Sequence, residues 1–269
     1  GAGRPGAGVI EVAKGATANS CEYEPVVPDP IKRVSETIKE EDLEKAAKII
    51  NKAKRPFFLV GGGAVISEAS EEVTEFAHKL NAPVADSLMG KGAFPGTDDL
   101  YTGMIGMHGT KVANFGIHQA DVVVVIGARF SDRVVGNAKK FVPKAKIVQI
   151  DIDKAEINKN IMIDQPVIGD VKEVLVRLLP LINERPADEW NKDIEELKAK
   201  YPLTYDQSGL TGPYVVEEIY RATKGEAIIS TDVGQHQMWA AQYYKYTKPH
   251  TLLTSGGLGT MGYGLGACI

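Results

Sequence analysis

The sequence predicts an α/β protein in which a doubly wound parallel sheet forms a central domain and the start of a second α/β domain follows it. Short β-rich runs, largely apolar like buried parallel strands, occur at residues 57–60, 82–85, 122–126, 147–152 and 166–168. Helical segments lie between these runs, and strands that alternate with helices form parallel βαβ units. Glycine or acidic residues follow several of the strands.

The helices are predicted by apolar residues that recur at helical spacing. Residues 42–51 place Leu43, Ala46, Ala47 and Ile50 on one face. The same pattern or helical character is found at residues 71–80, 111–118 and 171–182. We therefore expect the central domain to cover approximately residues 30–184, with helices on both faces of its sheet.

A second domain is expected to begin after the break at residues 183–186. A helix with Trp190, Ile194 and Leu197 on one side comes first, and further elements are predicted at residues 214–222, 227–230, 235–244 and 250–254. Near the N-terminus, residues 8–13 are predicted to form one isolated strand.

Composition excludes several classes of protein. The 269 residues are 43% hydrophobic and 25% charged with a net charge of −4, which is typical of a globular protein of about two domains. No basic, aromatic-rich segment predicts nucleic-acid binding, and the longest apolar run, residues 122–126, is too short to cross a membrane. Cys21 and Cys268 lie at opposite ends and form neither a zinc motif nor a disulfide framework, so a reducing compartment is expected.

The candidate ligand-binding residues of the central domain lie in loops at the carboxyl ends of its strands. They lie at residues 61–63, 127–133, 151–153 and 169–171. Any one of them has a plain structural explanation as a tight turn or a helix cap. Together, at the edge where parallel strands and helix N-termini converge, they predict a bound nucleotide.

The segment GMIGMHG, residues 103–109, allows two interpretations. It is either a loop folded onto the core with a hydrogen-bonded His108, or a flexible apolar wall against an aromatic cofactor, for which the adaptable thioether of methionine is suited. His78, His118 and His250 are far apart in the sequence, so no metal cluster is predicted.

Two turns in the second domain suggest a diphosphate site. Gln235 and His236 stand where a strand enters a helix, and backbone and side-chain donors at such a point can bind phosphate. The stretch SGGLGTMGYGL contains the spacing Gly257-x-Gly259-x-x-Gly262 after a strand, which is a weak dinucleotide signature on its own. Trp239 is either a core residue or a wall of the substrate pocket.

These motifs resemble a known family. The segments DVGQHQMWAAQYY and KPHTLLTSGGLGTMGYGL, together with VGGG, GMHGT, GARFSDR and IDIDKAEINKN, are similar to the catalytic subunits of acetolactate synthase (acetohydroxyacid synthase), which are thiamin diphosphate-dependent enzymes. The resemblance runs in order from GRPG to GYGL, and it implies an internal fragment. On this basis residues 1–28 would be the C-terminal remnant of a pyrimidine-side thiamin domain, residues 29–185 a central FAD-binding domain, and residues 186–269 a truncated diphosphate-side thiamin domain.

The resemblance also implies roles for individual residues. FAD would contact Arg4, Gly61, Gly62, Met107, His108, Gly127, Arg129, Asp151, Ile152, Asp170 and Val171. Thiamin diphosphate would lie against Val233, Gln235, His236, Gly259 and Met261. Around the substrate, Asp132 and Arg133 would face the active-site mouth, with Arg133 binding a carboxylate; Lys14 would lie in the access channel, and Met238 and Trp239 would shape the acceptor pocket.

The implied reaction is a decarboxylation of pyruvate on thiamin diphosphate, followed by ligation of the two-carbon unit to a second 2-keto acid, in branched-chain amino acid biosynthesis. FAD and magnesium would be further cofactors, with the magnesium ligands outside residues 1–269, so this piece alone would be inactive. Family members are homodimers or homotetramers and often recruit a small regulatory subunit. A cytoplasmic location is expected, or an organellar one if a transit peptide has been removed.

Two other functions stay open on the sequence alone. The chain could belong to another thiamin diphosphate-dependent carboligase or decarboxylase, although GMHG and QMW argue against that. It could also act as a flavin- or nucleotide-binding module without catalysis.

Overall fold

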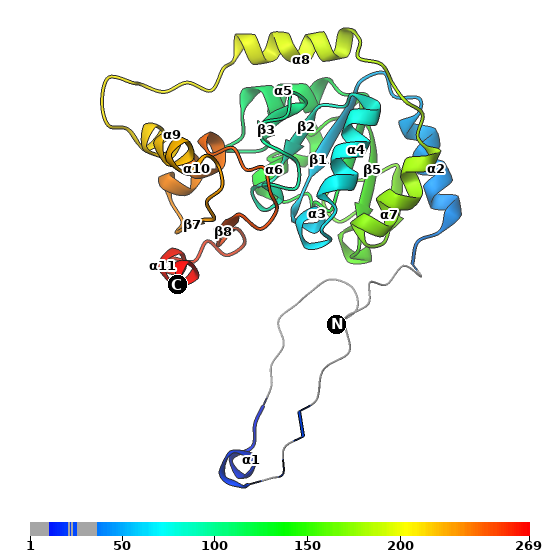
Figure 1. Ribbon diagram of the computed structural model, residues 1–269. Coiled ribbons are helices and arrows are strands. Elements are labelled where there is room, and N and C mark those ends of the chain that lie inside the picture. Colours follow the sequence, from blue (N-terminus) through cyan, green and yellow to red (C-terminus); the bar gives the residue numbers. More distant parts are fainter. Residues whose placement is uncertain (1–10, 21, 23, 26–36) are drawn as a thin grey trace.

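Six parallel strands form the main sheet of the computed structural model, which describes residues 11–20, 22, 24–25 and 37–269 (Figure 1). The strand order is β3-β2-β1-β4-β5-β6, and every neighbouring pair is parallel. The strands are β1 (Pro56–Val60), β2 (Val84–Asp86), β3 (Tyr101–Met104), β4 (Val122–Ile126), β5 (Lys146–Asp151) and β6 (Gln165–Ile168). This is the doubly wound order, so the predicted fold class is confirmed.

The strand that the sequence did not predict is β3. Its residues YTGM alternate between half-buried and buried positions, and β3 is the edge strand that pairs with β2 alone. Without a continuous apolar run it gives no signal for a buried strand. Gly103 and Met104, which the sequence placed in a loop, therefore end a strand instead.

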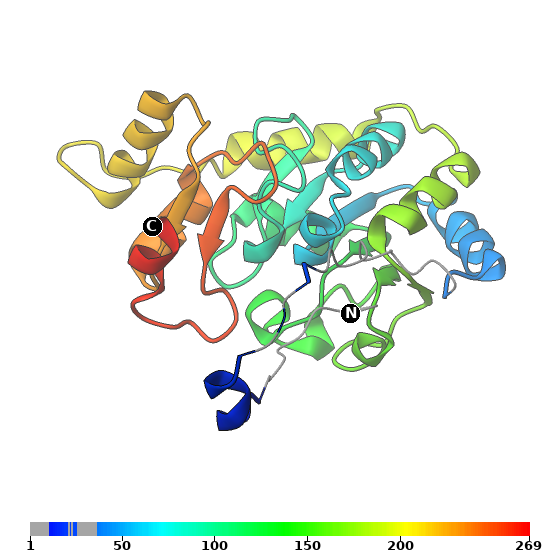
Figure 2. The same ribbon diagram turned by 60° about the horizontal axis from the view of Figure 1, so that its bottom comes forward.

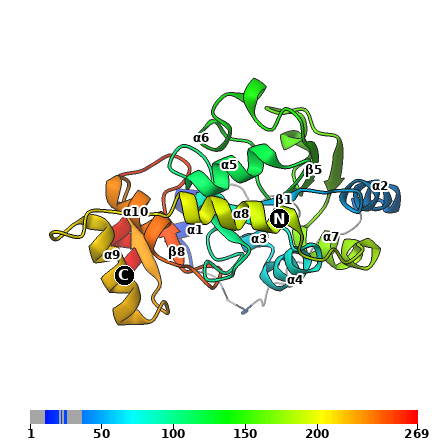
Figure 3. The ribbon, with the colours of Figure 1, turned by 90° about the horizontal axis from the view of Figure 1, so that it is seen from above.

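Helices cover both faces of the sheet, as Figure 3 shows for α4 and α7 on one side and α5 on the other. On the first face, Phe58 of β1 packs against Phe76 of α4 with ring centroids 4.6 Å apart. The helices of this face are α2 (Glu40–Ile50), α3 (Gly62–Ile66), α4 (Ser70–Leu80) and α7 (Val171–Leu178), which ends in the short 3-10 helix η4 (Leu179–Leu181).

The opposite face is covered by α5 (Lys111–Gln119) and α8 (Glu189–Lys200). Trp190 and Ile194 of α8 are buried against this face, and the Trp190 indole Nε1 donates a hydrogen bond of 2.9 Å to the carbonyl of Pro56. The sequence placed α8 in the third segment of the chain, beginning at residue 186, but its apolar side packs on the central sheet. The predicted domain boundaries themselves stay predictions.

A smaller unit lies beside the β3 edge, drawn in orange to red in Figures 1 and 2. It contains α9 (Gly212–Thr223), β7 (Ile229–Thr231), α10 (Gln235–Tyr243), β8 (Leu252–Thr254) and α11 (Tyr263–Cys268), and its two strands pair in parallel. Two hydrogen bonds of 2.7 Å join it to the loops before and after β3: the Gln242 side chain donates to the His108 carbonyl, and the Gly96 amide donates to the Tyr246 carbonyl.

Before α2, the described helix is α1 (Lys14–Ala18), which is exposed and lies away from both sheets in Figures 1 and 2. The strand expected at residues 8–13 is not found at residues 11–13, which have no partner strand; residues 8–10 lie outside the described part. Among the described residues, no helix combines the length and apolar character needed to span a membrane.

Candidate functional site

A cleft of about 1590 Å³ opens at the carboxyl ends of the central strands. Strand β1 pairs with β2 on one side and with β4 on the other, so the chain order reverses between β1 and β4. In doubly wound sheets ligands bind at this switch point, because the loops there diverge and leave a crevice. Loops after β1, β2, β3, β4, β5 and β6 line the cleft, and the turn after β8 closes it from the smaller unit.

Glycines form the floor of the crevice between β1 and β4. A Cβ atom on Gly61 would lie 2.4 Å from the Gly127 carbonyl oxygen, and the Gly63 amide donates a hydrogen bond of 2.8 Å to that same oxygen. Gly127 itself has φ +58°, in the left-handed region that favours glycine. The two loops can approach this closely only because neither carries a side chain at the contact.

Acidic residues end β5 and precede α7 at the same edge. Asp151 is buried, and its Oδ1 accepts a hydrogen bond of 2.9 Å from the Asp153 amide. Asp170 is the N-cap of α7 and accepts from the amides of Lys172 and Glu173, at 3.1 and 3.3 Å, and from the Ser67 hydroxyl at 2.5 Å. Both carboxylates are therefore fixed in place at the cleft wall.

We expect Asp170→Ala to lower the free energy of unfolding by about 2 kcal/mol in the absence of any ligand, because three donors lose their acceptor at a helix N-terminus. Urea denaturation followed by circular dichroism measures this change. The matched control is Asp164→Ala, which removes one exposed acceptor, for the amide of Ile147. Equal stability of Asp170→Ala and the natural chain would show that the carboxylate has no capping role.

The segment after β3 exposes its second methionine to the cleft. Met104 and Ile105 are buried, whereas Met107 is 61% exposed and, with the exposed His108, lines the cleft. The Asn114 side chain holds the turn by bonding both the amide and the carbonyl of Gly106 at 3.1 Å. Of the two interpretations open to the sequence, the arrangement favours an apolar wall of the cleft.

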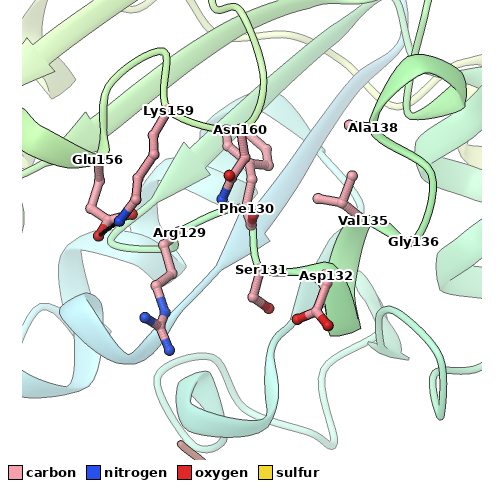
Figure 4. A pocket seen from close by; sticks show the side chains of 10 residues that line it. All are labelled: Arg129, Phe130, Ser131, Asp132, Val135, Gly136, Ala138, Glu156, Lys159 and Asn160. Atoms are coloured by element: carbon pink, nitrogen blue, oxygen red, sulfur yellow. Dashed lines mark hydrogen bonds and ion pairs between the residues drawn. The ribbon is translucent and has the colours of Figure 1, made fainter.

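The loop after β4 separates the large cleft from a smaller hollow of about 430 Å³, which Figure 4 shows from close by. Arg129, Ser131 and Asp132 border both spaces. In the smaller hollow Lys159 turns toward Glu156, with 3.1 Å between Nζ and Oε1. The short helix α6 (Asp132–Val135) follows. Its Arg133 side chain is 74% exposed, and the guanidinium Nη1 lies 3.8 Å from Oδ2 of Asp132.

The smaller unit brings some of its predicted residues to the cleft and leaves others outside. Val233, Met238 and Gly259 line it. Trp239 packs over Gly212, where a Cβ atom would come within 2.1 Å of the indole ring. Asp232 follows β7 and accepts from the amides of Tyr263 and Gly264, at 2.8 and 3.2 Å, which ties the glycine-rich turn back to that strand.

The predicted site residues thus fall into three groups. Those that line the cleft are Gly62, Met107, His108, Gly127, Arg129, Asp132, Arg133, Asp151, Ile152, Asp170, Val171, Val233, Met238 and Gly259. Those that are described but do not line it are Lys14, Gly61, Gln235, His236, Trp239 and Met261. Arg4 lies outside the described residues. The assignment of each residue to a particular cofactor stays a prediction.

Sequence reasoning missed the loop after β2. Leu88, Met89 and Lys91 line the cleft, from the 3-10 helix η1 (Leu88–Gly90) and the residue that follows it. A signal was available, because SLMGKG follows an apolar strand and contains glycines, like the loops that were identified. Gln237 was missed because it lies inside a helix, where only the fold shows which side chains face the cleft.

Known proteins match both parts of the chain. The model of the thiamine pyrophosphate enzyme central domain matches residues 43–178, which is half of the chain. The model of the C-terminal TPP binding domain of thiamine pyrophosphate enzymes matches residues 232–269. The first match contains the six-stranded sheet, and the second begins directly after β7.

Three curated relatives are all named acetolactate synthase. The acetolactate synthase large subunit of Haemophilus influenzae is 41% identical over 99% of this chain and 49% of its own length. The chloroplastic acetolactate synthase 2 of Nicotiana tabacum is 42% identical over 99% of this chain and 42% of its own length. The probable acetolactate synthase large subunit of Methanocaldococcus jannaschii is 44% identical over 84% of this chain and 40% of its own length.

The chain spans about half the length of the curated relatives it matches, or somewhat less. The doubly wound sheet, the cleft at its switch point and the two domain matches agree with one another. The chain therefore belongs to the thiamine pyrophosphate enzymes, with matches to their central domain over residues 43–178 and to their C-terminal TPP binding domain over residues 232–269.

Proposed function

We propose that this chain is part of the large, catalytic subunit of an acetolactate synthase, which decarboxylates pyruvate and joins the two-carbon unit to a second 2-keto acid. The observation that carries the proposal is the convergence of the loops after all six central strands and the turn after β8 on one cleft. The names of the relatives support it at 41 to 44% identity. The predicted division at residues 28 and 185 belongs to the same proposal.

FAD is proposed for the part of the cleft between β1 and β4. The residues present suit a flavin dinucleotide: the bare backbone of Gly62 and Gly127 allows a phosphate to approach, and the exposed guanidinium of Arg129 can balance its charge. Asp151 stands at the end of β5, where a carboxylate can accept from a ribose hydroxyl. Met107 offers an apolar, polarisable surface for a ring system.

Thiamin diphosphate is proposed for the side formed by the smaller unit, where Val233 and Gly259 line the cleft and α10 begins at Gln235. Amides at a helix N-terminus suit a diphosphate. When bound, this cofactor supplies the carbon centre on which the 2-keto acid loses carbon dioxide. Magnesium would balance the diphosphate; among the described residues, no cluster of three or more His, Cys, Asp or Glu side chains could hold it.

The protein side chains would position the substrates. Arg133, exposed at the cleft, can bind the carboxylate of a 2-keto acid through two parallel hydrogen bonds, and an Asp132 carboxylate oxygen lies 3.8 Å from its guanidinium. Met238 would form an apolar wall for the acceptor. Trp239 does not line the cleft, and its proposed part in shaping the acceptor pocket rests on the resemblance alone. Lys14 is proposed for the access channel, although it does not line the cleft and α1 lies away from both sheets in Figure 1.

Assembly and location follow from the same proposal. Relatives named large subunits imply a small-subunit partner for those proteins, and we propose one here, together with a homodimer or homotetramer. The plant relative is named as chloroplastic. We propose a cytoplasmic location for this protein, or an organellar one after removal of a transit peptide.

The proposal predicts that the full-length gene product, supplied with thiamin diphosphate, magnesium and FAD, forms acetolactate from pyruvate. A colorimetric acetoin assay after acid decarboxylation detects the product, and omission of each cofactor in turn is the control. Acetaldehyde alone, or a preference for glyoxylate as donor, would indicate another thiamin diphosphate-dependent enzyme. Bound flavin without turnover would indicate a binding module.

A further inference from the structure

A buried polar cluster lies at the base of the loop after β2, and its member Lys91 also lines the cleft. Asp86 ends β2, Lys91 follows η1, and Tyr101 begins β3. The Lys91 ammonium lies 3.1 Å from the Asp86 carboxylate and donates to the Tyr101 hydroxyl at 2.6 Å, and this hydroxyl lies 3.0 Å from both oxygens of Asp86. Asp86 and Lys91 are 1% and 5% exposed, so the charges pair with each other rather than with water.

Burying charged groups in this way costs free energy of folding, which a structural role of the cluster would explain. Burial raises the pKa of the Asp86 carboxyl, and the Lys91 ammonium offsets only part of that rise. Buried ion pairs contribute little net stability compared with apolar side chains of similar volume, but losing one partner leaves a stranded charge. Their best-supported use is to specify one geometry among several.

The geometry specified here is that of a turn. Asp86 and Lys91 stand at the two ends of the segment 87–90, and their side chains meet, so the ion pair closes the turn into a ring. Tyr101 bonds to both and fixes the ring to β3. Gly90 completes the constraint: a Cβ atom there would come within 2.3 Å of the Val60 carbonyl oxygen, so the turn rests directly on β1.

Met89, at the tip of this turn, touches both halves of the cleft. Its Cβ lies 3.0 Å from the position of a Cβ on Gly62, in the turn after β1. Its Sδ lies 2.3 Å from the position of a Cβ on Gly256, in the turn after β8. The side chain is nevertheless 47% exposed, so part of it faces the open cleft.

We propose that Asp86, Lys91 and Tyr101 are positioning residues that hold Met89 as a wall shared by the two halves of the cleft, and that they thereby set the affinity of the cleft for FAD. Methionine has three rotatable bonds and adapts to a ring system, so only its backbone anchor can give the wall a fixed place. The identity of the ligand rests on the proposed function; the positioning of Met89 does not.

The positioning is tested without ligand by methyl NMR of the chain labelled with ¹³C-methyl methionine. The sequence has six methionines, so the spectrum is simple, and Met89→Leu assigns the signal. In Lys91→Leu and Tyr101→Phe we expect the Met89 signal to move and broaden, while that of Met162, which is 75% exposed, stays in place. An unmoved Met89 signal in both variants overturns the proposal.

A second pair of variants serves as the control for loss of folding. Lys91→Leu strands the Asp86 carboxylate, so its melting temperature is expected to fall; Asp86→Asn combined with Lys91→Leu removes both charges and is expected to restore part of that loss. The Met89 signal should remain displaced in the double variant, because the ring stays open. Lys45→Leu, which breaks the exposed ion pair with Glu41, is the matched control for loss of a lysine charge.

The effect on ligand affinity is tested by a double-mutant cycle with FAD, followed by flavin fluorescence. Lys91→Leu is expected to weaken FAD binding on the order of tenfold in the natural background, and to have little effect once Met89→Ala has removed the wall. Independent, multiplicative effects of the two substitutions overturn the inference. A natural chain that binds no FAD overturns the proposed flavin site, whereas the methyl spectrum still decides whether the cluster holds Met89.

Discussion

Replacing Gly127 with alanine is expected to destabilise the protein by about 4 kcal/mol, because backbone strain and overpacking act at the same position. Gly127 has φ +58°, and a Cβ atom would lie 2.7 Å from the Ala64 amide nitrogen and from two backbone atoms of Gly63. These are backbone atoms of the turn that begins α3, so they cannot rotate away as a side chain would. The expected result is a large drop in the urea midpoint, together with loss of the proposed FAD binding.

Gly136→Ala is the matched control for this prediction. Gly136 has φ +61°, almost the same as Gly127, but no atom lies within 4 Å of its Cβ position. Its ψ is −102°, which alanine rarely combines with a positive φ, so the substitution is expected to cost about 2 kcal/mol from strain alone. The difference between the two variants measures the cost of separating the loops after β1 and β4. Equal losses would show that close approach contributes nothing at the switch point.

If the proposed function holds, Arg133→Ala is expected to lower kcat/KM for pyruvate about 100-fold in the full-length protein, because the proposed charge-assisted contact to the substrate carboxylate would be lost. The backbone at this residue is already fixed: the Met107 amide donates a hydrogen bond of 2.9 Å to the Arg133 carbonyl. The substitution therefore removes the guanidinium without releasing the loop. Steady-state kinetics with pyruvate, together with FAD affinity as a check on the cleft, measures the effect.

Two further variants sharpen the test. Arg133→Lys keeps the charge but loses the planar fork, so we expect it to recover only part of the rate. Arg177→Ala, which breaks the ion pair between α7 and Glu40 of α2 away from the cleft, should leave kcat/KM unchanged. A full rate in Arg133→Ala would remove this residue from substrate binding, and weaker FAD binding in that variant would assign it to the flavin instead.

The fold was largely predictable from local pattern. Residues such as Val122–Ile126, apolar at every position, are typical of a strand covered on both faces, and the segments between such runs place their apolar residues on one side. Strand β3 escaped because an edge strand with Thr and Gly carries no such run. The packing of α8 on the central sheet was not predicted, because the pattern of an amphipathic helix does not indicate which of two sheets its apolar side will contact.

The glycines and carboxylates of the candidate site were predictable from the sequence, but the side chains of the loop after β2 that line the cleft were not. Loops at strand ends are identified by the rule that carboxyl ends of parallel strands share one edge, and Gly62, Gly127, Asp151 and Asp170 all lie there. His236 was assigned to a diphosphate from its turn as well as from the family resemblance, and Met261 from the resemblance alone, yet both are exposed and neither lines the cleft.

The sequence by itself determined the doubly wound fold, the edge that carries the ligand loops and the family, because each depends on patterns that are local or collinear with relatives. The tertiary structure alone decided that Met89 touches turns 27 residues before it and 167 residues after it, at Gly62 and Gly256, and that Asp86, Lys91 and Tyr101 meet in one buried cluster. Such contacts depend on how strands are ordered in the sheet and on which helix faces pack, and side-chain spacing along the chain does not record either.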